Sequence, residues 1–300
     1  MSSKRLGYVT IGIGVLVAAT TMAVRLHHRR IRRPARGETL WRLHYQLAIR
    51  DVQRGDKVRV ALPENTAECR VIRETWSYPG FSVDVLRNRQ TGGREAVAVA
   101  LMPAEARQIA ATFDIYMSPK LPEGTQPTQP KLPVLARARY LREEKLVQIS
   151  SPTVGRVLKE FSATQRSKSE LVQNIADYCF EHIGQDERAS YSDAATTLQQ
   201  KTGTTVGRAR AMVALCRKAK MPARLVAGFV LENRTDVRPH VWVQVFTKRG
   251  WVPFDPENGY ARELPPNYVP ARLDGSAVAR GLEARVISDY RVRRLVPPEA

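Results

Sequence analysis

The chain is poor in the residues that build disulfide frameworks and zinc sites. Its 300 residues include only three cysteines, Cys69, Cys179 and Cys216, which are widely separated and form no CxxC pair. An odd number without close spacing argues against a disulfide framework, so we interpret all three as small buried side chains. No zinc-ligand spacing is present either. The sequence therefore predicts neither a bound metal nor a cofactor.

Acidic residues are also scarce: 29 Asp and Glu stand against 48 Lys and Arg, which gives a net charge of +19. Such a surface attracts phosphates, anionic lipids or acidic polymers. The basic residues are spread along the chain, however, without an RNP-like aromatic run or a basic-zipper pattern. Specific nucleic-acid binding is therefore not expected. The length allows one large or two medium domains with a sizeable core.

One uncharged run stands near the N-terminus. Gly7–Val24 contains no charge over eighteen residues, which is long enough to span a bilayer as a helix. We predict a tail over residues 1–6, a single membrane anchor over 7–24 and a basic juxtamembrane segment over 25–37. A cleaved signal peptide ending at Ala23 is the alternative.

Six arginines follow the run within residues 25–36. The positive-inside rule would place the body of the protein in the cytoplasm. A basic segment of this kind also binds anionic lipid headgroups, at about 1 kcal/mol per charge. The simpler alternative is that it only ends the membrane helix.

From Leu40 the apolar residues recur with a period of two, in short runs separated by turn residues. This pattern predicts a small antiparallel β-sandwich or half-barrel over residues 38–118. Pro103–Arg107 is predicted to open a short helix, because Pro and Glu both suit a first turn. The predicted strands are Leu40–Ile49, Asp56–Pro63, Cys69–Tyr78, Phe81–Asn88 and Gly93–Pro103.

Residues 119–137 are rich in Pro, Thr and Gln and predict an extended linker between two domains. The second domain, residues 138–300, begins with helices and continues with strands, which indicates an α+β core. Helices are predicted over residues 150–163, 167–183 and 206–219. Strands are predicted over residues 224–231, 240–247, 250–255 and 283–295.

The stretch from Gly203 to Pro256 has the layout of a cysteine, histidine and aspartate site. Such sites hold a thiolate at a helix N-terminus beside an imidazole, which a third group orients. Here the helix start carries Thr205, and the candidates for the other two roles are His240 and Asp255 on strands joined by a turn at residues 248–250.

Several motifs in this stretch resemble the papain-like core of the transglutaminase-like superfamily. They are Pro222-Ala-Arg224, Gly228, the His-x-Trp pair that ends at Trp242 and the Trp-x-x-x-Asp-Pro run that starts at Trp251. The resemblance covers about Thr153 to Tyr260. It implies that Thr205, Trp242 and Trp251 contact a ligand. Lys220 departs from the family, which usually has Gly before the Pro-Ala-Arg run.

In that family the nucleophile precedes the Ala of an Ala-Leu-x-Arg run by nine residues, and counting back from Ala214 leads to Thr205. Cys216 cannot replace it, because eleven helical residues separate the two positions by about 16 Å. An internal threonine lacks an adjacent base and is a weak nucleophile. Helix capping explains Thr204 and Thr205 without catalysis.

The first half of the chain is similar to the inactive transglutaminase-like proteins of bacterial membranes. The similarity lies in the Trp41-Arg-Leu-His-Tyr strand, the Gly55–Pro63 strand and the Tyr78-Pro-Gly-Phe turn after an anchor. That branch is usually fused to seven transmembrane helices, which are not seen here. The resemblance implies an inner-membrane protein with a periplasmic soluble part that binds peptides, often beside ATP-grasp amide ligases.

Three functions follow from these features. The first is an inactive, membrane-anchored domain that binds a peptide or glutamyl-type ligand, whose acidic groups would suit the basic surface. The second is an active protease, amidase or acyl transferase that uses Thr205 or a cysteine. The third is a scaffold for a multispanning membrane partner.

Overall fold

The structure is a computed structural model that describes residues 38–66, 68–89, 91–118, 131–162, 167–232, 237–282 and 285–295. All of them belong to one unit, Gly37–Ala300. Among these residues, no helix is long and apolar enough to cross a membrane. The predicted anchor over 7–24 and the basic segment over 25–37 lie outside the described residues, so both remain predictions.

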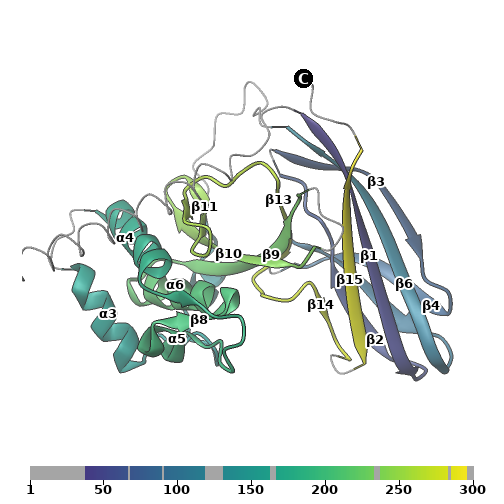
Figure 1. Cartoon of the computed structure of the whole chain (residues 1–300), viewed down its shortest axis with the longest axis horizontal. Coiled ribbons are helices and arrows are strands. Elements are labelled where there is room, and N and C mark those ends of the chain that lie inside the picture. The colour runs from purple at the N-terminus through teal and green to yellow at the C-terminus, as the bar shows by residue number, and fades with distance from the viewer. Residues whose placement is uncertain are drawn as a thin grey trace, which may run out of the picture. The chain divides into compact units, whose positions relative to one another are not determined.

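Two four-stranded antiparallel sheets form the predicted sandwich (Figure 1). Alternate residues of the first long strand point into the core, because successive side chains of a strand face opposite sides. Leu43, Tyr45, Leu47 and Ile49 are each at most 1% exposed. One sheet has the order β15 (Val286–Arg294), β1 (Thr39–Val52), β6 (Ala104–Met117) and β3 (Cys69–Ser77); the other has β14 (Ala279–Arg280), β2 (Lys57–Ala61), β5 (Arg94–Ala100) and β4 (Phe81–Arg87).

The helix predicted at Pro103–Arg107 is wrong, because this segment begins the long strand β6. β6 pairs with β1 on one side and with β3 on the other. Its buried residues, among them Ile109, Phe113 and Ile115, follow the two-residue period. The local preference of Pro and Glu for a first helical turn is weaker than pairing along two neighbouring strands.

The sandwich also takes strands from the end of the chain. β15 pairs with β1 over nine residue pairs, from Trp41↔Arg294 to Ile49↔Val286. β14 pairs with β2 in the other sheet. The final strand, which the sequence placed with the strands of the second domain, therefore completes the first sheet. Of the predicted linker, residues 119–130 lie outside the described part, and residues 134–137 begin the short helix α2 (Val134–Arg139).

The α+β core consists of a five-stranded sheet and a group of helices. The central sheet has the order β12-β11-β10-β9-β13 and is antiparallel. Its members are β9 (Ala223–Val230), β10 (His240–Thr247), β11 (Gly250–Asp255), β12 (Tyr260–Ala261) and β13 (Tyr268–Leu273). The helices are α3 (Pro152–Ser162), α4 (Lys168–Glu181), α5 (Ala194–Gln200) and α6 (Thr205–Lys218), gathered beside β9 and β10 (Figure 1). A short parallel pair, β7 (Gly184–Gln185) and β8 (Thr202–Gly203), precedes α6.

Helix α6 is the central helix of this core. Ten of its fourteen residues are buried, including Arg208 and the run from Ala211 to Arg217. It packs against α3, α4 and α5 and against strands β9 and β10. The predicted burial of Cys179 and Cys216 is confirmed, since both are 0% exposed, and Cys69 is equally buried.

Lys220 lies in the turn between α6 and β9, at the position where the resemblance implies a glycine. Its φ is +58°, in the left-handed region where glycine is most at ease. The glycine that the resemblance implies here would adopt this conformation freely, and a lysine adopts it at some cost. Gly228 on β9 has a different constraint, because an added Cβ would meet the Val269 carbonyl oxygen and the Trp242 ring.

Candidate functional site

Asp255, at the end of β11, is the most buried charged group of the site, with 1% exposure. Its Oδ2 atom accepts hydrogen bonds from Tyr268 Oη at 2.6 Å, Asn258 Nδ2 at 2.8 Å and His240 Nε2 at 2.8 Å. Its Oδ1 atom accepts the backbone N–H groups of Glu257 and Asn258 at 2.9 and 3.2 Å. Burial opposes ionisation, but the charge of His240 and the hydrogen bonds from His240, Tyr268 and Asn258 outweigh it and lower the Asp255 pKa to about 2.

His240 is the first residue of β10 and is held on three sides. Its Nε2 atom donates to Asp255, because an ionised carboxylate can only accept. The Trp242 ring stacks beside the imidazole, with centroids 6.2 Å apart, and the Tyr268 ring meets it edge-on at 5.7 Å. The other ring nitrogen, Nδ1, therefore points away from Asp255 and toward the side of the site where α6 begins.

Thr205 is the first residue of α6, at the position where the sequence placed the missing nucleophile. The capping residue is Thr204, whose hydroxyl oxygen accepts the Gly207 N–H at 3.1 Å. The expectation that Thr205 also caps the helix is wrong, because its hydroxyl and its backbone N–H both contact the Glu187 carboxylate, at 2.7 and 2.8 Å. The exposed start of α6 is thus occupied by an acidic side chain.

A second carboxylate, Glu257, lies between Thr205 and His240. Its Oε2 atom is 2.8 Å from Thr205 Oγ1 and 3.3 Å from His240 Nδ1. Gln185 donates from Nε2 to both Glu257 and Glu187, at 2.9 and 3.3 Å. In a cysteine-dependent site His240 Nδ1 would face a thiolate, and here it faces a carboxylate instead.

The protons at this point limit what the site can do. The Thr205 hydroxyl has one proton to donate and two carboxylates within hydrogen-bond distance. A carboxylate is far too weak a base to remove that proton from an alcohol. Burial opposes ionisation of Glu187, but the hydrogen bonds from the Thr205 hydroxyl and N–H lower its pKa. Asp255 and Glu187 are thus held as hydrogen-bond acceptors, while Glu257 lies 3.3 Å from His240 Nδ1.

Arg208 balances part of this negative charge from within α6. It is 4% exposed, and its guanidinium donates to the carbonyl oxygens of Cys179 and Phe180 at the end of α4. Burial lowers its pKa, and the nearby carboxylates of Glu257, Asp255 and Glu187 oppose this shift only in part. The guanidinium thus holds α4 against α6 and offsets the carboxylates around Thr205.

Two other residues named by the sequence lie in different places. Trp242 is 1% exposed and packs against His240 and Tyr268, so it supports the imidazole from within the core. Trp251 belongs to a separate cluster, in which its ring meets Tyr140 at 4.9 Å and carries the Arg224 guanidinium at 4.1 Å. It stands four strand residues from Asp255, about 13 Å along β11.

The sequence did not point to Glu187, Glu257, Asn258, Tyr268 or Gln185. Glu257 and Asn258 follow the Asp-Pro motif directly and could have been found as part of it. The β7–β8 pair, which spans only two residues on each strand, brings Gln185 to Glu257 and Glu187 to Thr205. Pairings this short leave no periodic pattern in the sequence.

The family comparison agrees with this geometry. Residues 156–256 match the model of the transglutaminase-like superfamily. This part of the chain is therefore a transglutaminase-like superfamily domain, and the matched range contains Thr205, His240 and Asp255. No curated protein matches the sequence.

Two solved structures extend the comparison to the fold. A protein described as a candidate cysteine protease from Cytophaga hutchinsonii superposes with a TM-score of 0.64 at 16% identity, covering 88% of this chain and 93% of its own. A candidate protease from Parabacteroides distasonis gives a TM-score of 0.30 at 14% identity, covering 69% of this chain and 42% of its own. The first likeness shows that the fold, beyond the matched domain, is shared with a known structure.

The lowered pKa of Asp255 predicts a specific pH dependence of stability. A carboxyl whose folded-state pKa is below its ordinary value of 3.8 stabilises the fold above that value and loses the contribution as pH falls toward about 2. The difference in unfolding free energy between the native protein and Asp255→Asn should therefore shrink by about 2 kcal/mol from about pH 5 to about pH 2. Urea denaturation at several pH values measures it.

The matched control is Asp84→Asn, which changes an exposed aspartate of the sandwich. Its difference from the native protein should stay constant over the same range. Parallel pH profiles for the native protein and Asp255→Asn would show that Asp255 is not held ionised by its partners.

Proposed function

We propose that the protein is a catalytically silent transglutaminase-like protein, anchored in a membrane, that binds a peptide or peptide-like ligand at the site around Thr205 and His240. One observation supports this most: the Thr205 hydroxyl and N–H both contact Glu187, while Glu257 lies between Thr205 and His240 Nδ1.

Acyl transfer of the cysteine type needs a nucleophile, a base and donors for the oxyanion. At this site each role is compromised. A threonine hydroxyl stands in place of the thiol. Glu257 contacts His240 Nδ1, the nitrogen that would accept the proton of the nucleophile. Glu187 accepts the N–H group at the helix start. The frame that would position a substrate is kept, while the groups that would react are engaged with each other.

The charges at the site favour a ligand with an amino group. Asp255 and Glu257 contact His240, and Glu187 and Glu257 contact Thr205. Arg208 offsets part of this negative charge. Glu187 is exposed, and the Glu257 side chain is 20% exposed, so an incoming ammonium group can reach both. The net positive charge of the chain favours acidic groups of a ligand at the basic surface outside this site. At the site itself, the carboxylates favour a peptide amino terminus or a lysine side chain.

Restoring a thiol tests the silence of the site. In the native protein, burial raises the pKa of Cys69 and Cys179 to about 12. Burial raises the pKa of Cys216 further still. Iodoacetamide should therefore label none of the three thiols. Thr205→Cys should react slowly, because nearby carboxylates disfavour a thiolate. Thr205→Cys with Glu257→Ala should react about tenfold faster, since the thiol then faces His240.

The control is the same double variant with His240→Ala added, which should lose the gain. Amide hydrolysis is measured in parallel on all four proteins. Turnover by the native protein, labelling of its Cys216, or equal reactivity of Thr205→Cys with and without Glu257 would contradict the proposed silence.

Peptide binding tests the ligand class separately. We expect peptides with a free amino terminus to bind more tightly than the same peptides after acetylation, as measured by isothermal titration calorimetry. Glu257→Gln should weaken the binding of the unacetylated peptides by about tenfold, because one charge-assisted hydrogen bond is lost. Glu105→Gln, at an exposed position of β6, is the control and should bind as the native protein does. If acetylation has no effect, the amino group is not the recognised feature.

The membrane part of the proposal rests on Gly7–Val24 and on the resemblance to the membrane branch of the family. It places the soluble part in the periplasm, with an ATP-grasp ligase or a multispanning protein as a possible neighbour. A C-terminal fusion to alkaline phosphatase should then be active, whereas a cytoplasmic body would leave this reporter inactive and a fluorescent cytoplasmic reporter bright.

A further inference from the structure

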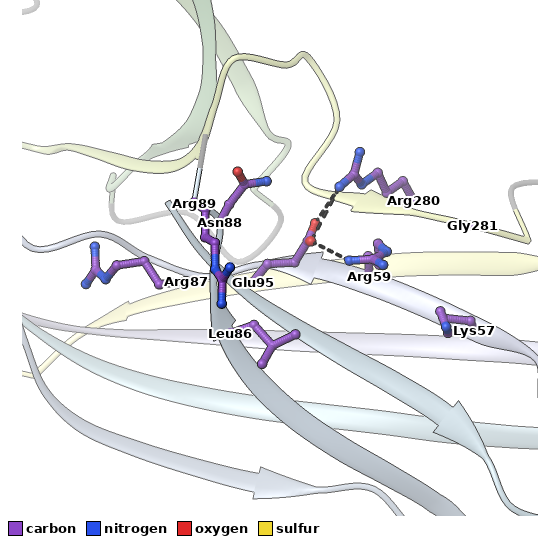
Figure 2. A pocket seen from close by; sticks show the side chains of 9 residues that line it. All are labelled: Lys57, Arg59, Leu86, Arg87, Asn88, Arg89, Glu95, Arg280 and Gly281. Atoms are coloured by element: carbon purple, nitrogen blue, oxygen red, sulfur yellow. Dashed lines mark hydrogen bonds and ion pairs between the residues drawn. The ribbon is translucent and has the colours of Figure 1, made fainter. Parts of the chain in front are cut away.

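A basic pocket lies on the sandwich sheet that contains β2, β4, β5 and β14. Its volume is about 690 Å³, within the usual range of small-molecule sites. The charged residues that line it are Lys57, Arg59, Arg87, Arg89, Glu95 and Arg280 (Figure 2). On β2 the residues that alternate with Lys57 and Arg59, Val58 and Val60, are buried in the core. The pocket therefore opens on the outer face of the sheet, and we refer to it as the arginine pocket.

Glu95 fixes the positions of the guanidinium groups. It is 6% exposed and is contacted by Arg59 Nη1 at 3.0 Å and by Arg280 Nη2 at 2.9 Å, as Figure 2 shows. Arg272, from β13, adds a third contact at 2.9 Å. Burial opposes ionisation of Glu95, but its arginine partners lower its pKa. The guanidinium groups are thus held in place rather than left to swing freely on the surface.

One carboxylate does not neutralise this cluster. Five cationic side chains and one carboxylate line the pocket, a formal excess of four positive charges. Arg87 has a distant partner in Glu64, at 3.9 Å. Burial lowers the pKa of Arg272, hydrogen bonding to Glu95 raises it, and the charges of Arg280 and Arg59 lower it again. The cations around Glu95 therefore repel one another.

The excess charge and the side-chain type indicate the ligand. A phosphate diester carries one negative charge and a monoester about −1.5 to −2 at neutral pH, so two phosphate groups bring about two to four negative charges to the four positive ones. Guanidinium groups bind phosphate oxygens in pairs, which lysines alone cannot do. Leu86, 53% exposed at the pocket edge, offers an apolar contact beside the charges. Asp84, on the same strand as Leu86, does not line the pocket.

We propose that the arginine pocket is a binding site for a ligand that carries two phosphate groups. The ligand is either a soluble diphosphate or the headgroup of a lipid with two phosphates, and the chemistry recognised is the same. This site lies on the sandwich strands, apart from the Thr205 site, and does not depend on the function proposed for that site.

The experiment uses the full-length protein with two probes: inorganic pyrophosphate, and vesicles of phosphatidylcholine with or without cardiolipin. The pocket variant is Lys57→Gln with Arg89→Gln. Both positions are exposed, so the substitutions should leave the fold intact, which circular dichroism checks. The control variant is Lys248→Gln with Arg249→Gln, which removes the same charge from the exposed β10–β11 turn.

Binding of at least one probe should weaken by about tenfold in the pocket variant, since charge-assisted contacts are lost, and stay near the native value in the control variant. Loss of pyrophosphate binding identifies a soluble ligand, and loss confined to cardiolipin vesicles identifies a headgroup. Equal weakening in the two variants would show a diffuse effect of net charge and overturn the proposal. So would native protein that binds neither probe.

Discussion

The ionised carboxylate of Asp255 is the group on which the site depends. Five hydrogen-bond donors surround it, three at one oxygen and two at the other. A buried charge is costly unless it is paired and hydrogen-bonded. Moving any one of these donors away would therefore raise the free energy of the folded protein, which holds each donor in place. His240 is thereby fixed with its Nε2 proton toward Asp255 and with Nδ1 toward the start of α6. Tyr268 ties β13 to the same point.

This constraint explains why the orientation of the imidazole does not depend on the residue at position 205. The imidazole is oriented by Asp255 and supported by Trp242, and neither contact involves the residue at position 205. A threonine there leaves the orientation unchanged, and Glu257 fills the place opposite Nδ1. The two carboxylates around Thr205 turn a position suited to a nucleophile into a closed hydrogen-bond network, with Arg208 offsetting the charge. The arginine pocket on the sandwich is the opposite case, because five cationic side chains line it and only one carboxylate, Glu95, partly neutralises them.

The sequence predicted those features that leave a period or a motif. The sandwich strands follow from alternation, as in β1, and Thr205, His240 and Asp255 follow from motif spacing. The sequence does not predict features that depend on long-range pairing. The start of β6 has the local pattern of a helix but pairs with β1 and β3, and β15 follows the core in the chain but pairs with β1. Glu187 was missed because the two-residue β7–β8 pair brings it to Thr205, and no local pattern records that approach. The anchor over residues 7–24 stays a prediction.

Glu257 lies opposite His240 Nδ1, where a cysteine-dependent site would hold a thiolate. Nitrogen-15 NMR of the His240 ring, recorded on the native protein and on Glu257→Gln, measures this contact. We expect Nδ1 of the native protein to show a hydrogen-bonded proton whose signal changes strongly in Glu257→Gln, while the Nε2 signal, set by Asp255, moves little. An Nδ1 signal that is the same in both proteins would show that Glu257 is not the partner of His240.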